Sequence, residues 1–599
     1  YAVEQECQRK GHVFLVAKDF LAAVRRVDPT VDAQKALTFA LEQKLLVAEI
    51  ESRRLYAPKL FDAEKGVARN LARLMAPAQA LTSRSAEEIR RKLHKDASKI
   101  NASFEGGLDE AQIEAVVSIL TSPSRLHVLT GGPGTGKTAI VECMVYLLKR
   151  KSFSFAAPTG KAAKVLSSRV ASMGYSASTI HSLLRGGPED GFQVNEESPL
   201  DCDVLVVDES TMNGIELANG LLNAVGENTH VIFIGDPGSA ATAHERARAG
   251  QLPSIAPGRF MRDLLELPDV NHVNLSRTYR NSGGILEVVN EIRDGVLDVR
   301  DRPNVRFHGL PAAGVGFAAV QAQFVEYVIK VGIENTLLIM PKRQGDRAVA
   351  DWNTTYANAM LRSVVNPQGV RLPGSTLAVG DRIIIRQNLS IEQPDSTEKA
   401  VLRMGASLTM PGAALPLGFN RDLLVGDTPV SASVVEDDDD DVFRGNDAAS
   451  GDGRTERVVN GDTGTIIGYS MDPRVPRVGS PKWIHLLLDD GRKLDFPGDD
   501  SACLDLAYAL TVHAGQGSEY RSVMMVVTPG TPDFMNQNMV FTGFSRGRSD
   551  LVIYGDPSVL KKIAATPMPE RNSALVERVN EEMRLADSPA DVCADQFSR

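Results

Sequence analysis

The chain is 599 residues long, with 43% hydrophobic residues and a formal net charge of -10 at pH 7. That length exceeds what one hydrophobic core supports and predicts about four domains. No apolar run of about 18 residues occurs, so we expect no membrane-spanning helix and no membrane partner, and the scattered cysteines predict a reduced, intracellular compartment. The five cysteines are scattered without a C-x-x-C pair, which argues against a disulfide framework or a zinc site.

The negative charge is concentrated in one segment of the chain. Residues 389–457 contain 14 Asp or Glu and 6 Lys or Arg, a net charge of -8, so the remaining residues are close to neutral. Within it, Glu436 to Asp441 reads EDDDDD. Such a composition buries too little apolar surface to fold alone, so we predict an acidic disordered insertion. The alternative is a tether that docks a protein partner or inhibits the chain.

The first 75 residues predict a small helical unit. Amphipathic segments at 16–27 and 31–46 precede a pattern typical of a β-hairpin that turns at 52–54. Two helices and a hairpin are the outline of a winged-helix unit, which binds DNA or packs against a neighbouring domain. Because the basic content of this unit is modest, we favour packing or contact with a protein. Residues 76–107 predict a connector that contains a basic helix.

The segment HVLTGGPGTGKTAIV carries the strongest motif. Its G-x-x-x-x-G-K-T pattern lies between an apolar strand and a helical segment, the setting of a phosphate-binding loop. Lys137 supplies charge for the β- and γ-phosphates, and the Thr138 hydroxyl is a ligand for Mg²⁺. We therefore predict ATP and Mg²⁺ as cofactors, with the nucleotide bound by Gly131, Gly132, Pro133, Gly134, Thr135, Gly136, Lys137 and Thr138.

Five side chains are further candidates for catalysis beside the lysine of this loop. DVLVVDEST ends an apolar strand in Asp208, which can hold Mg²⁺, and Glu209, which can orient or deprotonate the attacking water. Gln251 in QLPSIAPG is a candidate γ-phosphate sensor. Arg280 and Arg546 are candidates for arginines that a second domain carries into the site, where they stabilise transition-state charge.

Three motifs predict contacts with a nucleic-acid strand. FAAPTGKAA ends a strand and starts a helix, a place from which side chains can reach a phosphodiester backbone. STIHSLL and LAYALTVHAGQGSEY add polar side chains at similar junctions. The predicted strand contacts in these motifs are Pro158, Thr159, Lys161, His181, Thr511 and His513.

The second half of the chain predicts another core. Strands and helices alternate over 271–379 and again over 504–565. Between them, in 380–503, short strands and tight turns predict a small SH3-like barrel, which the acidic segment interrupts. Residues 566–599 predict a C-terminal tail.

Taken in order, the motifs resemble those of superfamily 1 helicases of the 5′-to-3′ branch, and specifically the RecD-like family. The resemblance covers 108–556 and rests on GGPGTGKT, APTGKAA, STIHSLL, VVDES, QLPSIAPG, the Tyr279-Arg280 pair, NGDTGTI, AYALTVHAGQGSEY and FSRGR. It implies an α/β fold in which two RecA-like parallel-sheet domains sandwich ATP, the first over 108–270 and the second over 271–379 with 504–565. A hairpin near 186–199 would split the duplex, and the SH3-like insertion would contact the strand.

For the site, the resemblance implies further residues. Gln112 would read the adenine edge, Gly517 and Glu519 would contact the nucleotide, and Asn388 and Asn460 would contact the strand. Single-stranded DNA would run across both RecA-like domains. ATP-driven 5′-to-3′ movement would then unwind a forked duplex in DNA repair, recombination or replication.

The chain departs from the family pattern at three places. A loop of 13 residues occupies 238–250, where it could displace Gln251; Ala514-Gly515 replaces a common Lys-Ser pair; and the acidic segment breaks the barrel. These departures leave alternatives to unwinding: a nucleotide-switched clamp or remodeller of nucleic acid, or the motor part of a conjugative relaxase. RNA is an alternative substrate, because backbone contacts and stacking discriminate sugars poorly.

Overall fold

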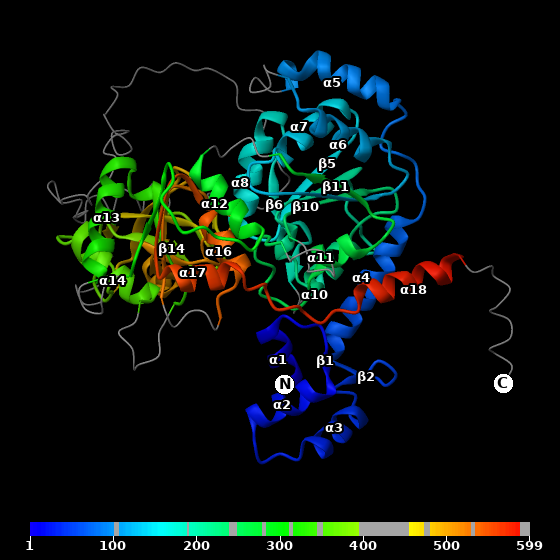
Figure 1. Ribbon diagram of the computed structural model, residues 1–599, viewed down its shortest axis with the longest axis horizontal. Helices are drawn as coiled ribbons and strands as arrows, with labels where there is room; N and C mark the ends of the chain where they lie inside the picture. The colour runs from blue at the N-terminus through cyan, green and yellow to red at the C-terminus, as the bar shows by residue number, and fades with distance from the viewer. Residues whose placement is uncertain are drawn as a thin grey trace.

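The computed structural model describes residues 1–100, 107–187, 191–238, 248–277, 283–310, 316–343, 352–394, 455–471, 480–528 and 534–587. We call its six-stranded parallel sheet with the covering helices lobe 1, and its five-stranded parallel sheet with the covering helices lobe 2 (Figure 1). A five-stranded antiparallel sheet, the inserted sheet, is connected in sequence to lobe 2. The two parallel sheets confirm the predicted α/β class.

Lobe 1 has the strand order β11-β4-β10-β9-β5-β6, with every pair parallel. Strands β4, β9 and β10 are buried along their whole length, as expected for a parallel sheet covered by helices on both faces. Its strands are β4 (Leu126–Gly131), β5 (Phe153–Ala157), β6 (Ala177–Thr179), β9 (Val204–Val207), β10 (His230–Gly235) and β11 (Asn271–Leu275). Its helices are α6 (Glu110–Thr121), α7 (Lys137–Leu147), α8 (Gly160–Val170), α9 (Ile180–Leu183), α10 (Ile215–Asn223) and α11 (Phe260–Glu266).

The predicted boundary between the two cores at residue 271 is wrong. Strand β11 pairs with β4 of lobe 1, in a parallel register that matches Asn271 with His127 and Leu275 with Gly131. The Asn271 side chain also donates to the Ser118 carbonyl at 3.3 Å, which ties the strand to α6. Lobe 1 therefore extends through Leu275.

Lobe 2 has the strand order β12-β23-β22-β13-β21, again with parallel pairs. Its strands are β12 (Val305–His308), β13 (Thr336–Met340), β21 (Ala509–Thr511), β22 (Tyr520–Val527) and β23 (Gly547–Gly555). Its helices are α12 (Gly284–Arg293), α13 (Gly316–Val331), α14 (Thr354–Val365), α16 (Gln537–Phe544) and α17 (Pro557–Ala564).

The inserted sheet has the order β19-β18-β17-β14-β20, with antiparallel pairs. Its strands are β14 (Arg382–Ile385), β17 (Thr463–Ser470), β18 (Trp483–Leu488), β19 (Lys493–Pro497) and β20 (Leu504–Leu506). The predicted return to lobe 2 at residue 504 is too early, because β20 pairs with β14 and not with the parallel sheet. The closed SH3-like barrel stays a prediction.

The ends of the acidic segment are ordered, which corrects the predicted disordered stretch. Strand β15 (Leu389–Glu392) pairs with β16 (Thr455–Val458) in an antiparallel ribbon that matches Leu389 with Val458. Ile391 and Val458 are buried there. The EDDDDD run and the rest of 395–454 lie outside the described residues.

The N-terminal unit packs on lobe 1, as favoured from the sequence. It contains α1 (Ala2–Lys10), β1 (Leu15–Val16), α2 (Ala17–Val27), α3 (Ala33–Glu42), β2 (Val47–Glu49), β3 (Arg54–Tyr56) and α4 (Pro58–Met75). Its hydrophobic core is continuous with that of lobe 1 through α4, α10 and α11. The connector contains α5 (Ala86–Ile100), and 186–199 contains a short ribbon of β7 (Gly186–Gly187) and β8 (Gly191–Phe192). No helix in the described ranges is long and apolar enough to cross a membrane.

The predicted C-terminal tail is folded where the structure describes it. Helix α18 (Leu575–Asp587) lies alongside α4, and the two are drawn in red and blue in Figure 1. Ahead of it, the Arg571 guanidinium donates to the carbonyls of Ser254 and Gly258, each at 2.7 Å. The backbone N–H of Asn572 donates to His12 Nδ1 at 3.0 Å. The segment after α17 thus joins lobe 2 back to lobe 1 and to the N-terminal unit.

Buried carboxylates hold this joint together. Glu64 on α4 is fully buried; it accepts from the Ala574 backbone N–H at 2.8 Å and from Arg578 Nε at 2.9 Å. The Ser573 hydroxyl lies 2.7 Å from a carboxylate oxygen of Asp263 on α11. Burial raises the pKa of Asp263 to about 7, although Arg259 acts in the opposite direction. The folded joint therefore binds a proton more tightly than the unfolded chain does.

We predict that Asp263 makes the stability of the joint depend on pH. A carboxyl whose pKa is 3.8 unfolded and about 7 folded contributes stability that is present below about pH 4 and lost as pH rises through about 7. The difference is a few kcal/mol at most, since one pKa unit corresponds to about 1.4 kcal/mol. Between pH 5 and pH 8, the melting temperature of the wild-type chain should fall more steeply with rising pH than the melting temperature of Asp263→Asn. Parallel curves would contradict this account.

Candidate nucleotide and nucleic-acid site

A cavity of about 490 Å³ lies between lobe 1 and lobe 2, where strands β4 and β9 end. Three positive and three negative side chains face into it, and Gln251 lies beside them. Lobe 1 contributes most of its wall and lobe 2 contributes Glu519 and Arg546. The lining residues are Pro133, Gly134, Thr135, Gly136, Lys137, Thr138, Val141, Leu166, Arg169, Asp208, Glu209, Ile234, Gln251, Glu519 and Arg546.

The phosphate loop wraps around its own lysine. Gly134 and Gly136 have φ values of 77° and 86°, a left-handed conformation that favours glycine. The Lys137 ammonium donates to the carbonyls of Gly131 at 2.7 Å and Gly132 at 3.0 Å. Burial lowers the pKa of Lys137, while the nearby carboxylate of Asp236 opposes that shift. A half-buried cation is thus held at the start of α7, and loop carbonyls are its hydrogen-bond partners among the described residues.

The two acids after β9 face this lysine across the cavity. Glu209 has a φ of 51°, an uncommon conformation for a residue with a side chain, and its backbone N–H donates to Asp208 Oδ1 at 2.8 Å. Burial and the adjacent Asp208 raise the pKa of Glu209, and the Arg546 guanidinium acts in the opposite direction. A carboxylate in this setting can accept a proton more readily than an exposed glutamate.

The 13-residue loop does not displace Gln251. The Gln251 backbone N–H donates to the Asp236 carbonyl at 2.7 Å, and its side chain lines the cavity. The backbones of Gly238 and Gly250 pack so closely that a Cβ on either glycine would clash. The loop therefore leaves and returns at one point, and residues 239–247 lie outside the described residues.

Lobe 2 holds the segment that follows Gln251. The Leu252 backbone N–H donates to Thr542 Oγ1 at 3.1 Å, and Gln516 Nε2 donates to the Leu252 carbonyl at 2.9 Å. A movement of lobe 2 would therefore displace Leu252, the residue next to the candidate sensor Gln251.

Arg546 reaches the cavity from the end of α16. It is 4% exposed, and its guanidinium donates to the Thr542 carbonyl at 2.9 Å and the Ser518 carbonyl at 3.2 Å. These bonds fix the Arg546 side chain, which lines the cavity together with Glu209. The Arg546 charge counteracts part of the rise in the pKa of Glu209. Arg280, the other arginine predicted to enter the site, lies outside the described residues.

Two arginines near the cavity were not predicted. Arg293 on α12 of lobe 2 forms an ion pair of 2.5 Å with Asp236 of lobe 1, and its guanidinium lies next to Gly132 of the phosphate loop. Arg169 on α8 donates to the Thr138 hydroxyl at 3.3 Å. Neither belongs to a motif with a phosphate-binding spacing, so only the fold brings them here.

A second cavity of about 320 Å³ shares Arg169, Asp208, Glu209, Glu519 and Arg546 with the first. Gly517 and Lys161 line it as well. The Lys161 ammonium lies 5.7 Å from the centre of the Tyr520 ring. The structure thus places Lys161, predicted as a strand contact, on the nucleotide side of the cleft.

Gln112 is engaged elsewhere. Its side-chain oxygen accepts from the Asp109 backbone N–H at 3.2 Å, which closes a capping box at the start of α6. It is absent from the residues that line the two cavities.

Four of the remaining predicted strand contacts, Thr159, His181, Asn388 and Asn460, lie near the place where α8 meets the inserted sheet. Thr159 caps the N-terminus of α8, and the Cβ that Gly160 lacks would overlap Val459 of the inserted segment. The Asn460 backbone N–H donates to Asn388 Oδ1 at 2.8 Å, which joins these two residues. Ser182, next to His181, accepts from Arg457 at 2.7 Å. In lobe 2, Thr511 ends β21 and accepts from the Ala514 backbone N–H at 3.3 Å, and His513 beside it is exposed.

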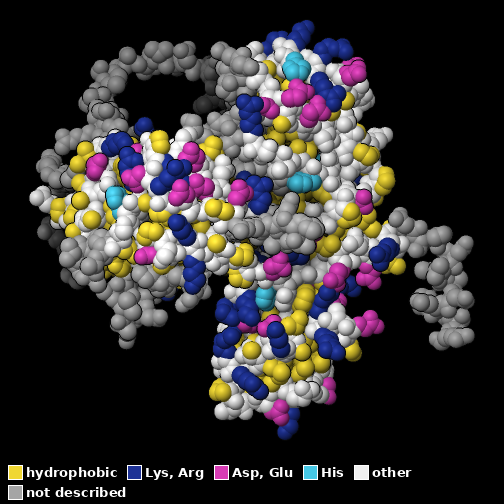
Figure 2. All heavy atoms as spheres, viewed as in Figure 1, with side chains coloured by type: hydrophobic (Ala, Val, Ile, Leu, Met, Phe, Trp, Pro, Cys, Tyr) yellow, Lys and Arg dark blue, Asp and Glu magenta, His cyan; other side chains and the backbone are white. Residues whose placement is uncertain are grey.

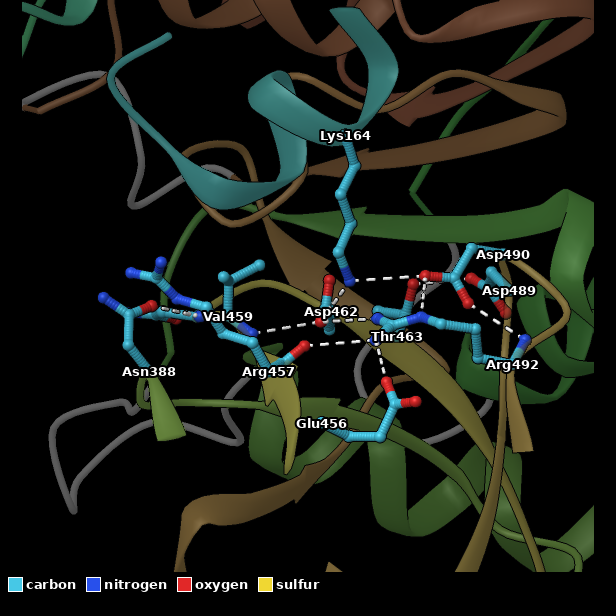
Figure 3. A network of polar contacts seen from close by, with 11 residues as sticks. Lys164, Asn388, Glu456, Arg457, Val459, Asp462, Thr463, Asp489, Asp490 and Arg492 are labelled. Atoms are coloured by element: carbon cyan, nitrogen blue, oxygen red, sulfur yellow. Dashed lines mark hydrogen bonds and ion pairs between the residues drawn. The ribbon is translucent and has the colours of Figure 1, made fainter. Parts of the chain in front are cut away.

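A polar network joins α8 to the inserted sheet. In Figure 3 the Lys164 side chain points from α8 toward two carboxylates, Asp462 at 2.6 Å and Asp490 at 3.3 Å. Arg492 pairs with Asp490 at 2.9 Å and with Glu456 at 3.2 Å. Asp462 is almost fully buried and also accepts from the Val459 backbone N–H at 3.0 Å. The inserted sheet is therefore fixed to lobe 1 as well as to lobe 2.

Comparison with known proteins gives matches along most of the chain. The AAA domain family matches residues 112–242, and the UvrD-like helicase C-terminal domain family matches residues 506–554. The ATP-dependent RecD2 DNA helicase of Deinococcus radiodurans is 25% identical over 601 residues, which cover 97% of this chain and 68% of that protein. The RecBCD enzyme subunit RecD of Haemophilus influenzae is 23% identical over 75% of this chain and 69% of its own length.

Among solved structures, Bacteroides Pif1 bound to ssDNA matches with a TM-score of 0.38 and 15% identity, over 77% of this chain and 94% of that one. The order of the motifs and the span of the sequence matches agree. Along most of its length the chain is therefore similar to RecD-like helicases.

Proposed function

We propose that this chain is an ATP-dependent DNA helicase that moves 5′ to 3′ on single-stranded DNA and unwinds forked duplex. One observation carries the proposal: Lys137, Asp208 and Glu209 of lobe 1 and Arg546 of lobe 2 line a single cavity. A triphosphate in that cavity would contact both lobes. Its binding and hydrolysis would then change how the lobes sit on a strand that crosses them.

Each charged side chain has a chemical role in this proposal. Lys137 would turn from the loop carbonyls to the β- and γ-phosphates, and Arg546 would stabilise the charge that develops in transfer. Glu209 would orient or deprotonate the attacking water, and Gln251 would sense the γ-phosphate. Arg280 keeps its proposed role as a second arginine from lobe 2.

The Thr138 hydroxyl and the Asp208 carboxylate would hold Mg²⁺. Both line the cavity, and hard oxygen ligands of this kind suit that ion. Mg²⁺ would supply charge that neutralises the phosphate oxygens.

The strand would cross the N-terminus of α8 in lobe 1 and the end of β21 in lobe 2. Pro158, Thr159, His181, Thr511 and His513 are the proposed contacts from the two lobes. Asn388 and Asn460 would add contacts from the inserted segment; their support is that Val459, next to Asn460, packs against Gly160 of α8, and that Asn460 bonds to Asn388. Backbone contacts of this kind hold a strand without reading its sequence.

We propose protein partners for the N-terminal unit. On the face seen in Figure 2, Lys and Arg side chains gather on this unit among hydrophobic ones. Phe39 is 57% exposed, Leu45 59% and Ile50 87%, which is unusual for large apolar side chains so close in sequence. Helix α3 has no buried residue. The acidic segment is the second proposed contact for a partner.

Lys137→Ala should abolish ATP hydrolysis, because the pocket loses the charge that faces the triphosphate. The wild-type chain should hydrolyse ATP faster with single-stranded DNA and should displace a strand from forks with a 5′ tail but not from forks with a 3′ tail. Arg150→Ala, which removes an exposed charge from lobe 1, is the matched control and should behave as wild type. Hydrolysis without strand displacement from either fork would indicate a clamp or remodeller instead.

Glu209→Gln should bind nucleotide but hydrolyse it about 10²- to 10⁴-fold more slowly, the usual contribution of a general base. In the wild-type chain, kcat/KM for ATP should fall as pH is lowered, because the base must be unprotonated. The midpoint should lie above the ordinary glutamate pKa of 4.5, since burial and Asp208 raise the pKa of Glu209. A variant with the wild-type rate and pH profile would remove Glu209 from the mechanism.

A further inference from the structure

Arg169 is a cation of the nucleotide cavity that no motif identifies. It lies in the last turn of α8, is half-buried, and lines both cavities of the cleft. Its Nη1 donates to Thr138 Oγ1 at 3.3 Å, so it contacts the residue that follows the loop lysine. Within the described ranges it forms no ion pair, and its charge is available to a ligand.

The charge of Arg169 acts on the groups that the proposed reaction uses. Arg169, Lys137 and Glu209 line the same cavity, and the guanidinium charge opposes protonation of the other two groups. Arg546 of lobe 2 lines the same cavity and acts on Glu209 as well. A triphosphate in the cavity would therefore meet cations from both lobes and from two different helices of lobe 1.

The N-terminal end of α8 packs against the inserted sheet, close to the proposed strand contacts. Thr159 caps the helix, Gly160 packs on Val459, and Lys164 bonds to Asp462 of the inserted sheet (Figure 3). The helix has 11 residues and no proline or internal glycine, so it is a straight rod of about 16 Å at 1.5 Å per residue. A displacement at one end of such a rod is transmitted to the other end.

We propose that Arg169 contacts the phosphates of the bound nucleotide and, through α8, links the nucleotide cavity to the strand-binding face. The Arg169 guanidinium donates to the Thr138 hydroxyl. Bound phosphates would compete for this guanidinium, and α8 would then shift against Val459 and Asp462. This inference rests on the proposed function and adds a residue to it.

A structural role for Arg169 makes different predictions. If Arg169 only supported the phosphate loop through Thr138, restoring a positive charge alone would not restore nucleotide affinity. Glutamine lacks the charge, and its amide nitrogen ends near the position of the arginine Nε, so Arg169→Gln removes both the charge and the bond of Nη1 to Thr138. Arg169→Lys restores the charge without the guanidinium, so recovery in that variant assigns the effect to a phosphate contact and not to support of the loop.

The experiment measures the affinity of the full chain for a fluorescent ATP analogue and, at saturating analogue, its affinity for a labelled oligo(dT). Arg169→Gln should bind the analogue about 10- to 100-fold more weakly, the loss expected for one charge-assisted hydrogen bond. The factor by which saturating analogue changes oligo(dT) affinity should fall toward one. Arg169→Lys should recover part of both, and Arg150→Ala should match wild type.

Arg169→Gln with wild-type affinity for the analogue and a wild-type coupling factor would overturn the inference. If Arg169→Gln does not fold, as judged by circular dichroism, Arg169→Lys decides: unchanged analogue affinity together with an unchanged coupling factor would overturn it. If the wild-type chain binds the analogue but no oligo(dT), the proposed function fails, whereas the analogue arm still decides whether Arg169 contacts phosphate.

Discussion

The structure depends on opposite charges that line one cleft between two lobes, where they are partly shielded from water. Lys137 is enclosed by its own loop carbonyls, and Asp208 and Glu209 face it from the end of β9. Burying such charges is costly unless partners lie close by, and no single element supplies all of them. The Arg546 guanidinium, fixed by lobe 2 carbonyls, completes the set only when the lobes adjoin. The charge balance of the cavity thus favours the arrangement of lobes that a triphosphate would use.

Much of the fold follows from local pattern, and the errors occur where pairing is long-range. The buried strands β4, β9 and β10 show apolar runs that predict a parallel core. Strand β11 reads NHVNL and is only half-buried at the sheet edge, so nothing local assigns it to β4. Strand β20 has three residues, and its partner β14 lies more than 100 residues earlier. Helix α18 is amphipathic, but its place on α4 depends on Glu64 and Arg578, which are 514 residues apart.

In the candidate site, too, residues in local motifs were predicted and residues brought in by long-range packing were missed. The spacing of the phosphate loop and the two acids after a strand predicted Lys137, Asp208 and Glu209, and the cavity contains all three. Arg169 and Arg293 have no such signal, because an isolated arginine in a helix is usually a surface residue. Only the packing of α8 and α12 brings them to the loop. Where the chain departs from the family pattern, the pinched loop at Gly238 and Gly250 leaves Gln251 in the cavity.

The proposed function requires that bound nucleotide change how the two lobes sit relative to one another. Fluorescence energy transfer between dyes at positions 150 in lobe 1 and 561 in lobe 2, both exposed, measures that movement in the strand-bound chain. The account predicts that transfer changes when a non-hydrolysable ATP analogue is added and returns when the analogue is removed. Transfer that stays constant while the analogue binds would contradict it.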